Sequence, residues 1–245
     1  MKLVSLLSFL IISLVAPTLG LSAEGDTYSF TWLDPDKEVY VLQNRKFRKS
    51  GRLYASLGGG ITTSGAFVDG NTFQGRVGYF FREQWGFEVL YSLNSGKEND
   101  TAQTVRVNPD ANGAGSIPFR RITDSYMGGM FLWSPFYSKI NTFNSILYVD
   151  WIIGLGLAKI DETNNTREVI NDPFDRSDTT ESHTGVLWDV GLKLYMNENW
   201  AVRTDFTGIN YQADRPTSVT NGSITSSEKD WYHHYDLTVS LVYDF

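Results

Sequence analysis

Leu147-Tyr148-Val149-Asp150-Trp151-Ile152-Ile153-Gly154-Leu155-Gly156-Leu157-Ala158 is the stretch that decides the fold. Large apolar side chains stand at every second position from Leu147 to Leu157, and Asp150 and small residues stand among the positions between them. A period of two is that of a β-strand, because a helix repeats about every 3.6 residues. One apolar face and one polar or small face suit a wall between lipid and a crowded interior.

Seven further segments show the same alternation with differing clarity. In 186–196 the apolar residues alternate with Asp189, Gly191 and Lys193, and 235–245 alternates in the same way and ends on Phe245. The others are 53–62, 73–81, 85–93, 125–133 and 200–211, of which 125–133 is ambiguous because both of its faces are apolar. Each has roughly the 9–11 residues that a tilted transmembrane strand needs.

The connections between these segments differ sharply in length. Residues 82–84 and 197–199 form short links, whereas 94–120, 159–184 and 212–231 are long and polar. Barrels in the bacterial outer membrane place short turns in the periplasm and long loops outside the cell. An open sheet edge in lipid would leave backbone groups unpaired at a cost of several kcal/mol each. We therefore predict an all-β fold, an up-and-down antiparallel transmembrane β-barrel of eight strands with both termini periplasmic; a soluble β-sandwich is the competing fold.

The first residues have the pattern of a secretory signal peptide. Lys2 precedes an apolar run over 3–15, and a small-residue site ends at Ala23. That run is shorter than the ~20 residues of a spanning helix, so we expect no transmembrane helix in the mature chain. We expect a signal peptide over 1–23, a short periplasmic segment over 24–50 and the barrel over 51–245.

Composition narrows the class of protein further. The chain has no cysteine, which excludes disulfides and lipid attachment through an N-terminal cysteine. Its formal charge is −7, and loss of residues 1–23 removes Lys2 and no acidic residue, which gives −8. Such acidity argues against binding of nucleic acid, which needs clustered basic residues. Aromatic residues make up 14% of the chain and 22 residues are glycine, which suits a barrel wall.

Two motifs resemble those of the Myxococcus-type (delta-proteobacterial) outer-membrane β-barrel family. They are Val39-Tyr40-Val41-Leu42-Gln43-Asn44-Arg45-Lys46 with Lys49-Ser50-Gly51-Arg52, and Ser134-Pro135-Phe136-Tyr137-Ser138-Lys139 leading into 144–156. Members more often have glycine where this chain has Ser138, which affects a turn. The resemblance implies location in a Gram-negative outer membrane and a barrel architecture, and it carries no site residues. The ending Leu241-Val242-Tyr243-Asp244-Phe245 resembles the aromatic signal read by the barrel-assembly machinery, with Phe245 as the contact.

Alternation also predicts which side chains face the lumen and which face lipid. A barrel of eight strands has an interior that side chains fill. We expect the inward polar residues to form a paired plug, with a proton or small-ion path as the alternative. The predicted lumen residues are Arg76, Glu88, Asp150, Asp189, Lys193, Arg203, Asp205 and Asp236. The predicted lipid-facing aromatic belt is Trp85, Trp151, Trp188, Trp200, Tyr235, Tyr243 and Phe245.

Some residues near the predicted loops are of types that carry chemistry. Lipid A deacylases and outer-membrane proteases use His with Ser or Asp, and this chain has His183, His233 and His234 near Glu181, Ser182 and Asp236. No Gly-x-Ser-x-Gly motif is present, so we predict that the chain is not an enzyme. The acidic residues of these loops lack the spacing of a Ca²⁺ loop, so we predict no metal and no cofactor. They are Asp161, Glu162, Asp172, Asp175, Asp178 and Glu181.

The sequence thus predicts a non-enzymatic outer-membrane barrel with a plugged interior, whose long loops serve surface recognition, adhesion or envelope integrity. A narrow ion or small-solute channel is the main alternative, and a lipid A hydrolase or protease is a third. Expected partners are outer-membrane lipids and lipopolysaccharide. The basic run Arg45 to Arg52 is either a solvated linker or a contact for head groups, and residues 24–50 can meet a periplasmic partner.

Overall fold

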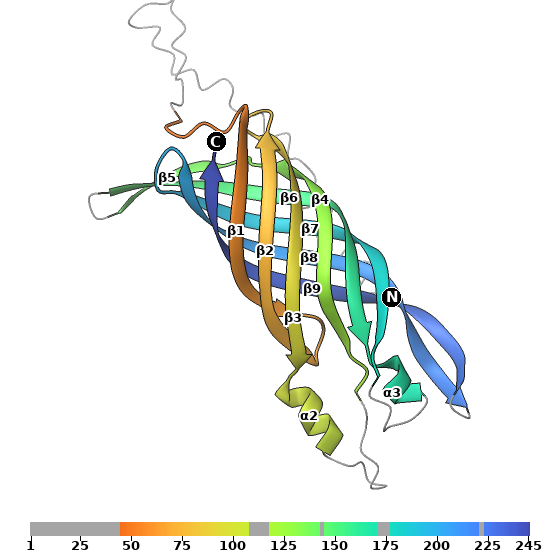
Figure 1. Cartoon of the computed structure of the whole chain (residues 1–245). Helices are drawn as coiled ribbons and strands as arrows, with labels where there is room; N and C mark the ends of the chain where they lie inside the picture. Colours follow the sequence, from red (N-terminus) through yellow and green to blue (C-terminus); the bar gives the residue numbers. More distant parts are fainter. Residues whose placement is uncertain (1–44, 108–117, 143–144, 171–176, 221–222) are drawn as a thin grey trace, which may run out of the picture. The chain divides into compact units, whose positions relative to one another are not determined.

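The computed structural model describes residues 45–107, 118–142, 145–170, 177–220 and 223–245 (Figure 1). The predicted signal peptide and residues 24–44 of the predicted periplasmic segment lie outside the described residues. The chain divides into the units Met1–Arg45 and Lys46–Phe245, and the second of these is the barrel. No helix within the described ranges is long and apolar enough to cross a membrane.

Nine described strands and two described helices make up the barrel unit. In chain order they are β1 (Arg52–Thr63), β2 (Val68–Phe80), β3 (Trp85–Glu98), α2 (Asp100–Val107), β4 (Arg121–Trp133), β5 (Tyr137–Thr142), β6 (Ser145–Asn164), α3 (Thr166–Ile170), β7 (Thr179–Tyr195), β8 (Trp200–Thr220) and β9 (Ser223–Asp244). Every pairing is antiparallel, β4 pairs with β6, and β1 pairs with β9. Eight strands, β1 to β4 and β6 to β9, therefore close a ring, which confirms the predicted fold class.

The strand β5 stands outside this ring and was not predicted. It pairs with the first residues of β6, from Thr142 opposite Ser145 to Tyr137 opposite Asp150. Further along, β6 leaves β5 and pairs with β4, beginning with Ile153 opposite Trp133. Thus β5 and the start of β6 form a small hairpin at the end of the barrel that carries the short turns and the C-terminus, here called the turn end (Figure 1). The opposite end is called the loop end.

Several strands at the loop end run further than the sequence predicts. Strands β6 and β7 stay paired up to Asn164 opposite Thr179, and β8 and β9 stay paired up to Thr220 opposite Ser223. The interpretation of 159–184 and 212–231 as loops throughout is therefore wrong. In these hairpins the alternation of apolar and polar residues ends before the backbone pairing does. Two antiparallel strands whose register is set within the barrel can stay paired as they extend into water, with polar residues on both faces.

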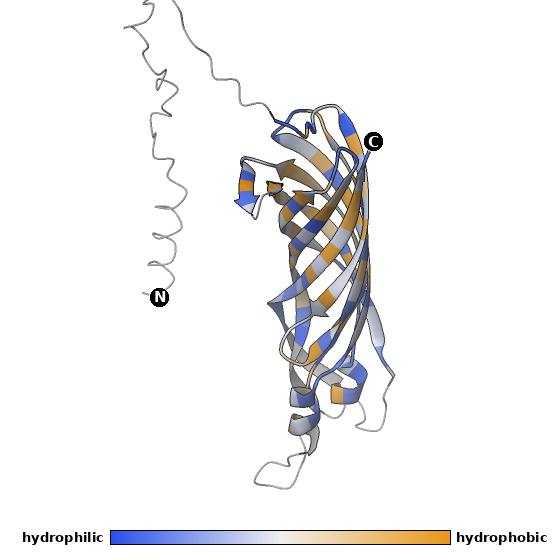
Figure 2. Cartoon of the chain, turned by 90° about the vertical axis from the view of Figure 1, so that its left-hand side faces the viewer, coloured by the Kyte–Doolittle hydropathy of each residue, from blue (hydrophilic) through white to orange (hydrophobic). Residues whose placement is uncertain are grey.

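Side chains alternate between lipid and lumen along the ring, and Figure 2 shows this as alternating hydropathy on the strands. Leu57 and Leu155 are each 63% exposed and belong to the outward face. On β6 and β7 the outward apolar positions end at Leu157 and Val186, because the next outward residues are Lys159 and Thr184. The paired segments beyond these positions thus project past the apolar band of the barrel.

The ambiguous segment in β4 is resolved by its register. Met127, Phe131 and Trp133 are exposed on the outer face, whereas Met130 and Leu132 are buried inside. Both faces are apolar because part of the lumen is packed with apolar side chains. Alternation alone cannot assign such a strand, since either face suits lipid.

Residues just before β1 pack into the turn end. Phe47 stacks on Tyr195 with ring centroids 4.9 Å apart and meets Tyr148 edge-on at 5.1 Å. Lys49 is 2% exposed, and its Nζ lies 2.7 Å from Oδ2 of Asp150. Phe47 and Lys49, which lie within the run Arg45 to Arg52, are therefore buried in the barrel. A solvated linker, one of the two sequence-based interpretations of this run, does not describe these two positions.

Candidate functional site

Two arginines cross-link three carboxylates at the centre of the lumen. Arg203 reaches Glu88 Oε2 at 2.5 Å, Asp205 Oδ1 at 2.6 Å and Asp189 Oδ2 at 3.0 Å. Arg76 Nη1 reaches the same three residues, at 3.0 Å for Glu88, 3.2 Å for Asp189 and 3.6 Å for Asp205. None of the five side chains is more than 2% exposed. We call these five residues the central network.

Neutral groups satisfy further atoms of the central network. Tyr54 donates its hydroxyl to Glu88, and Thr207 donates to Asp189 Oδ1 at 2.7 Å. The Nη2 of Arg76 donates to Gln74 Oε1 at 2.8 Å. Buried charges are tolerated only when they are paired and hydrogen-bonded, and every charge of this centre has an ion-pair partner and at least one hydrogen bond, although Asp205 Oδ2 has no hydrogen-bond partner among the described residues. The lumen is therefore filled by polar contacts at this level.

A second polar layer lies toward the turn end. Lys193 Nζ lies 2.6 Å from Asp244 Oδ1, and both residues are buried. Asp150 accepts a hydrogen bond of 2.7 Å from the Tyr195 hydroxyl in addition to its ion pair with Lys49. Lys49 also donates to Ser134 Oγ at 2.6 Å. The cation beside Asp150 thus comes from a residue before the first strand.

A third polar layer lies toward the loop end and centres on Asp236. Its Oδ2 accepts hydrogen bonds from Tyr126 at 2.6 Å and Gln74 at 2.9 Å. His234 Nε2 lies 3.1 Å from Asp236 Oδ1, and Ser64 Oγ lies 2.7 Å from His234 Nδ1. All eight of the predicted lumen residues are thus buried inside the barrel, distributed over three layers: Arg76, Glu88, Asp150, Asp189, Lys193, Arg203, Asp205 and Asp236.

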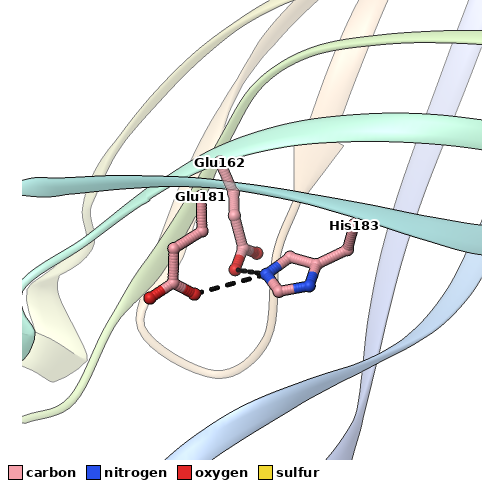
Figure 3. A group of neighbouring side chains, drawn as sticks. All are labelled: Glu162, Glu181 and His183. Carbon is pink, nitrogen blue, oxygen red and sulfur yellow. Dashed lines mark hydrogen bonds and ion pairs between the residues drawn. The ribbon is translucent and has the colours of Figure 1, made fainter.

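Glu162, Glu181 and His183 form a cluster at the loop end (Figure 3). His183 Nε2 lies 3.0 Å from Glu162 Oε1 and 3.3 Å from Glu181 Oε2. These are groups that can hold a divalent cation. However, Arg121 pairs with both glutamates, at 3.0 Å from Glu181 Oε2, and Tyr211 donates its hydroxyl to Glu162. A guanidinium already pairs with both carboxylates of this cluster.

Glu181 stands in the part of β7 that projects past the apolar band. Burial alone would raise the pKa of its carboxyl, but the hydrogen bond and the charge of Arg121 act the other way. The net result is a pKa below the ordinary value, so Glu181 is held as a carboxylate.

The chain's family follows from a comparison with known sequence families. The family model described as "Outer membrane protein beta-barrel domain" matches residues 43–245. The chain belongs to this family. Membership indicates the outer membrane of a Gram-negative bacterium as its location. Among curated proteins, no sequence matches the chain.

Solved outer-membrane barrels are similar to this family member at low identity. The N-terminal β-barrel domain of Pseudomonas aeruginosa OprF has 14% identity and a TM-score of 0.44, covering 80% of this chain and 98% of that one. Neisserial surface protein A has 11% identity and a TM-score of 0.43, with coverage of 80% and 98%. Ail, the attachment invasion locus protein of Yersinia pestis, has 12% identity and a TM-score of 0.42, with coverage of 80% and 99%.

The predicted aromatic belt of this outer membrane barrel consists of two clusters and two further residues. Trp200, Tyr243 and Phe245 lie together near the turn end, with centroids 4.9 Å and 5.0 Å apart in successive pairs. Trp188 and Tyr235 lie 6.2 Å apart, further toward the loop end. The remaining two, Trp85 and Trp151, also stand on the outer face: Trp85 stacks on Trp133 at 6.1 Å, and Trp151 is 42% exposed.

The three histidines do not form one site in this outer membrane barrel. His183 belongs to the cluster with Glu162 and Glu181, and His234 is buried beside Asp236. His233 faces outward, with its Nδ1 2.8 Å from Asn210 Oδ1. The serine next to His234 is Ser64, from the turn between β1 and β2, and sequence reasoning missed it.

The acidic residues considered for Ca²⁺ are also dispersed. Asp161 Oδ1 lies 3.8 Å from Lys159 Nζ and accepts the Ser182 hydroxyl, and Asp178 pairs with Arg120 at 3.1 Å. Asp172 and Asp175 lie outside the described residues. Only Glu162 and Glu181 of that set share a described cluster, and the arginine that joins them comes from β4, far away in sequence.

Proposed function

We propose that this protein is a sealed outer-membrane barrel whose loop end forms a rigid surface for recognition or adhesion. In this proposal the turn end and both termini face the periplasm, and the loop end faces outward, since short turns and long hairpins divide in that way in barrels of this class. The observation that carries the proposal is the central network, whose ion pairs lie inside the barrel among side chains at most 2% exposed.

A path for ions through this lumen would have to break several contacts at once. Each carboxylate of the central network touches both arginines, so moving one side chain leaves other buried charges without partners. Removing one partner of a buried pair typically costs about 3–5 kcal/mol. The layers around Asp236 and Asp150 would add further barriers on either side. This argument favours a plug over a channel.

The loop end is braced so that its hairpins keep a fixed arrangement. Arg120 donates its N–H to Asn165 Oδ1 at 2.8 Å, and its Nε lies 2.8 Å from Glu98 Oε1. Its Nη2 reaches Asp178 at 3.1 Å. One residue thereby connects the ends of β3, β4, β6 and β7. A rigid surface loses less conformational entropy on binding, which suits recognition.

Planar-bilayer recording tests the sealed lumen. The full barrel, refolded in detergent and shown to change gel mobility on boiling, should give no steady conductance. A reproducible conductance whose ion selectivity changes in Arg76→Gln would contradict the plug and would favour the channel.

Removal of the β8–β9 extension tests the recognition surface. Replacing residues 213–230 by a two-residue turn should leave a heat-modifiable barrel, because these residues project beyond the ring. Cells displaying the shortened chain should then adhere to one another and to a coated surface less than cells with the full chain. The matched control replaces residues 138–147 of the turn-end hairpin and should keep adhesion. Equal loss in both variants, or in neither, would count against the proposed surface.

Narrower proposals concern origin and partners. We propose that the chain belongs to the Myxococcus-type subfamily and that the barrel contacts lipopolysaccharide. We also propose that the barrel-assembly machinery recognises Phe245. Support for the last point is that Phe245 N–H donates to Leu53 O at 2.9 Å, so the residue lies where the ring closes. A periplasmic partner of residues 24–50 would have to bind mainly through 24–45, since Phe47 and Lys49 are already buried.

A further inference from the structure

Ser64, His234 and Asp236 form a linear array at the loop end of the lumen. Ser64 follows β1, and the other two are inward residues of β9. Ser64 Oγ lies 2.7 Å from His234 Nδ1, and His234 Nε2 lies 3.1 Å from Asp236 Oδ1. His234 is 1% exposed and Asp236 is fully buried, whereas Ser64 is half-buried. A hydroxyl, an imidazole and a carboxylate in this order are the parts of an activated serine nucleophile.

The serine of this array opens onto a cavity of about 420 Å³. Thr63, Ser64, Gly65, Arg121 and His233 border it, together with four aromatic side chains. His234 is absent from the lining and lies behind the serine. The position of a nucleophile at the surface with its base behind it is the one that catalysis needs. The aromatic lining consists of Tyr211, Trp231, Tyr232 and Tyr235.

We propose that this array is a serine acyl-hydrolase site for carboxylic esters with a small apolar acyl group. The cavity volume and aromatic walls fit such a group, and Ser64 borders the cavity. This activity goes beyond the proposed recognition role and departs from the sequence-based prediction that the chain is not an enzyme.

The surroundings of Asp236 and His234 bear on the direction of proton transfer. Tyr126 and Gln74 both donate to its Oδ2, so the carboxylate is held in place as an acceptor. His234 Nε2 also lies 3.1 Å from Asn94 Nδ2 and 3.4 Å from Thr62 Oγ1. The proposal requires the tautomer with the proton on Nε2, which the carboxylate beside that nitrogen favours and the amide of Asn94 opposes. The lone pair of Nδ1 then points to the Ser64 hydroxyl. Asp236 is thus a positioning residue, and His234 is the general base.

Two groups beside Ser64 can stabilise the oxyanion. The N–H of Gly65 directly follows the nucleophile in a turn where Gly65 has a φ of +84°. Arg121 borders the same cavity and can contribute positive charge, although its Nε is buried and its Nη1 pairs with Glu162 and Glu181. Thr123, two residues further along β4, has its Oγ1 3.1 Å from Ser64 Oγ, which brings the strand of Arg121 to the nucleophile. A donor and a positive charge near the carbonyl oxygen lower the barrier to acyl transfer.

The reaction balances with water as the only co-substrate. Ser64 Oγ bonds to the ester carbonyl carbon while its proton passes to His234 Nδ1. The C–O bond to the alcohol then breaks, and the leaving alkoxide takes that proton, which leaves an acyl-serine. Water attacks the acyl carbon and gives a proton to Nδ1, and that proton returns to Ser64 Oγ as the carboxylic acid departs.

The test uses the full barrel refolded in detergent, p-nitrophenyl butyrate as substrate and a fluorophosphonate as covalent probe. We expect hydrolysis above background and a probe adduct on Ser64 by mass spectrometry. Ser64→Ala and His234→Gln should lower kcat by about 10³-fold or more. Ser182→Ala is the matched control, because it removes a hydroxyl from the outer face of β7 and should leave the rate unchanged.

The array can instead be only part of the polar plug, and the same assays separate the two cases. A heat-modifiable barrel that hydrolyses the ester no faster than Ser64→Ala, or whose Ser64 stays unlabelled by the fluorophosphonate, overturns the proposal. Labelling of the unsubstituted chain needs no variant, so a folding defect in His234→Gln cannot hide the answer. Neither result depends on the conductance or adhesion of the barrel.

Discussion

Arg203 carries more buried ion pairs than a single side chain usually does, since it contacts Glu88, Asp189 and Asp205 within 3.0 Å. Arg203→Met should lower the free energy of unfolding by about 3–5 kcal/mol, because three buried carboxylates would then share Arg76 alone. Urea unfolding of the barrel in lipid vesicles, followed by tryptophan fluorescence, measures this change.

The matched control at the residue scale is Lys159→Met. Lys159 is 66% exposed and lies 3.8 Å from the half-exposed Asp161, so its loss should cost at most about 1 kcal/mol. Similar costs for the two substitutions would mean that water reaches the centre of the lumen and screens its charges.

The sequence predicted that eight charged side chains point into the lumen, but it predicted none of their specific contacts. Period-two alternation suffices to place Arg76, Glu88 and Arg203 in the lumen, because every residue on one face of a strand shares that direction. It says nothing about which residue of another strand lies opposite, which depends on register and on barrel closure. For that reason Lys49 beside Asp150, and Ser64 beside His234, were not predicted.

Element ends were harder to predict than element positions. The ring strands were recognised from their apolar outer faces, and this signal stops where β6 to β9 leave the apolar band. Their polar extensions resemble loops in composition, although the backbone pairing continues to Asn164 and Thr220. The helix α2 and the strand β5 are short and lack an apolar face of their own. Their structure depends on neighbouring segments that the sequence does not identify.

The segment before β1 can be tested as an element of the barrel. A chain that begins at residue 46 should be as stable as one that begins at residue 24. A chain that begins at residue 51 loses Phe47 and Lys49, and its free energy of unfolding should fall by about 3–5 kcal/mol, the usual cost of removing one partner of a buried ion pair. Equal stability of the three chains, measured by urea unfolding, would show that the turn end gains nothing from this segment.

The β6–β7 extension should loosen in acid. The folded pKa of Glu181 lies below its ordinary value, so its contribution to stability is present above the ordinary carboxyl pKa of about 4.3 and is lost as the pH falls through the folded value. Amide hydrogen exchange in residues 159–164 and 179–184 should therefore accelerate between pH 5 and 3 after correction for the intrinsic rate. The variant Arg121→Gln should show less of this acceleration, since the interaction that lowers the pKa is gone.

At the scale of the whole molecule, the outer face determines the fit to the bilayer. Leu155 is 63% exposed in the middle of the apolar face of β6, and Leu155→Arg should lower the stability in lipid by about 2–4 kcal/mol. Ser182→Arg, beyond the apolar band on β7, should cost less than about 1 kcal/mol. If both substitutions were tolerated equally, the apolar band would not lie where the outward residues place it.

The pairing of β1 with β9 determines when the ring of strands can close. The first strand to emerge has one edge that only the last strand can cover, from Tyr54 opposite Asp244 to Thr63 opposite Tyr235. That edge lacks its partner strand until β9 has been made and exported. A chain cut short anywhere before β9 can never finish its ring, so it remains recognisable as incomplete to proteases that inspect exposed strands. The seam between β1 and β9 therefore reports whether every strand of the ring is present.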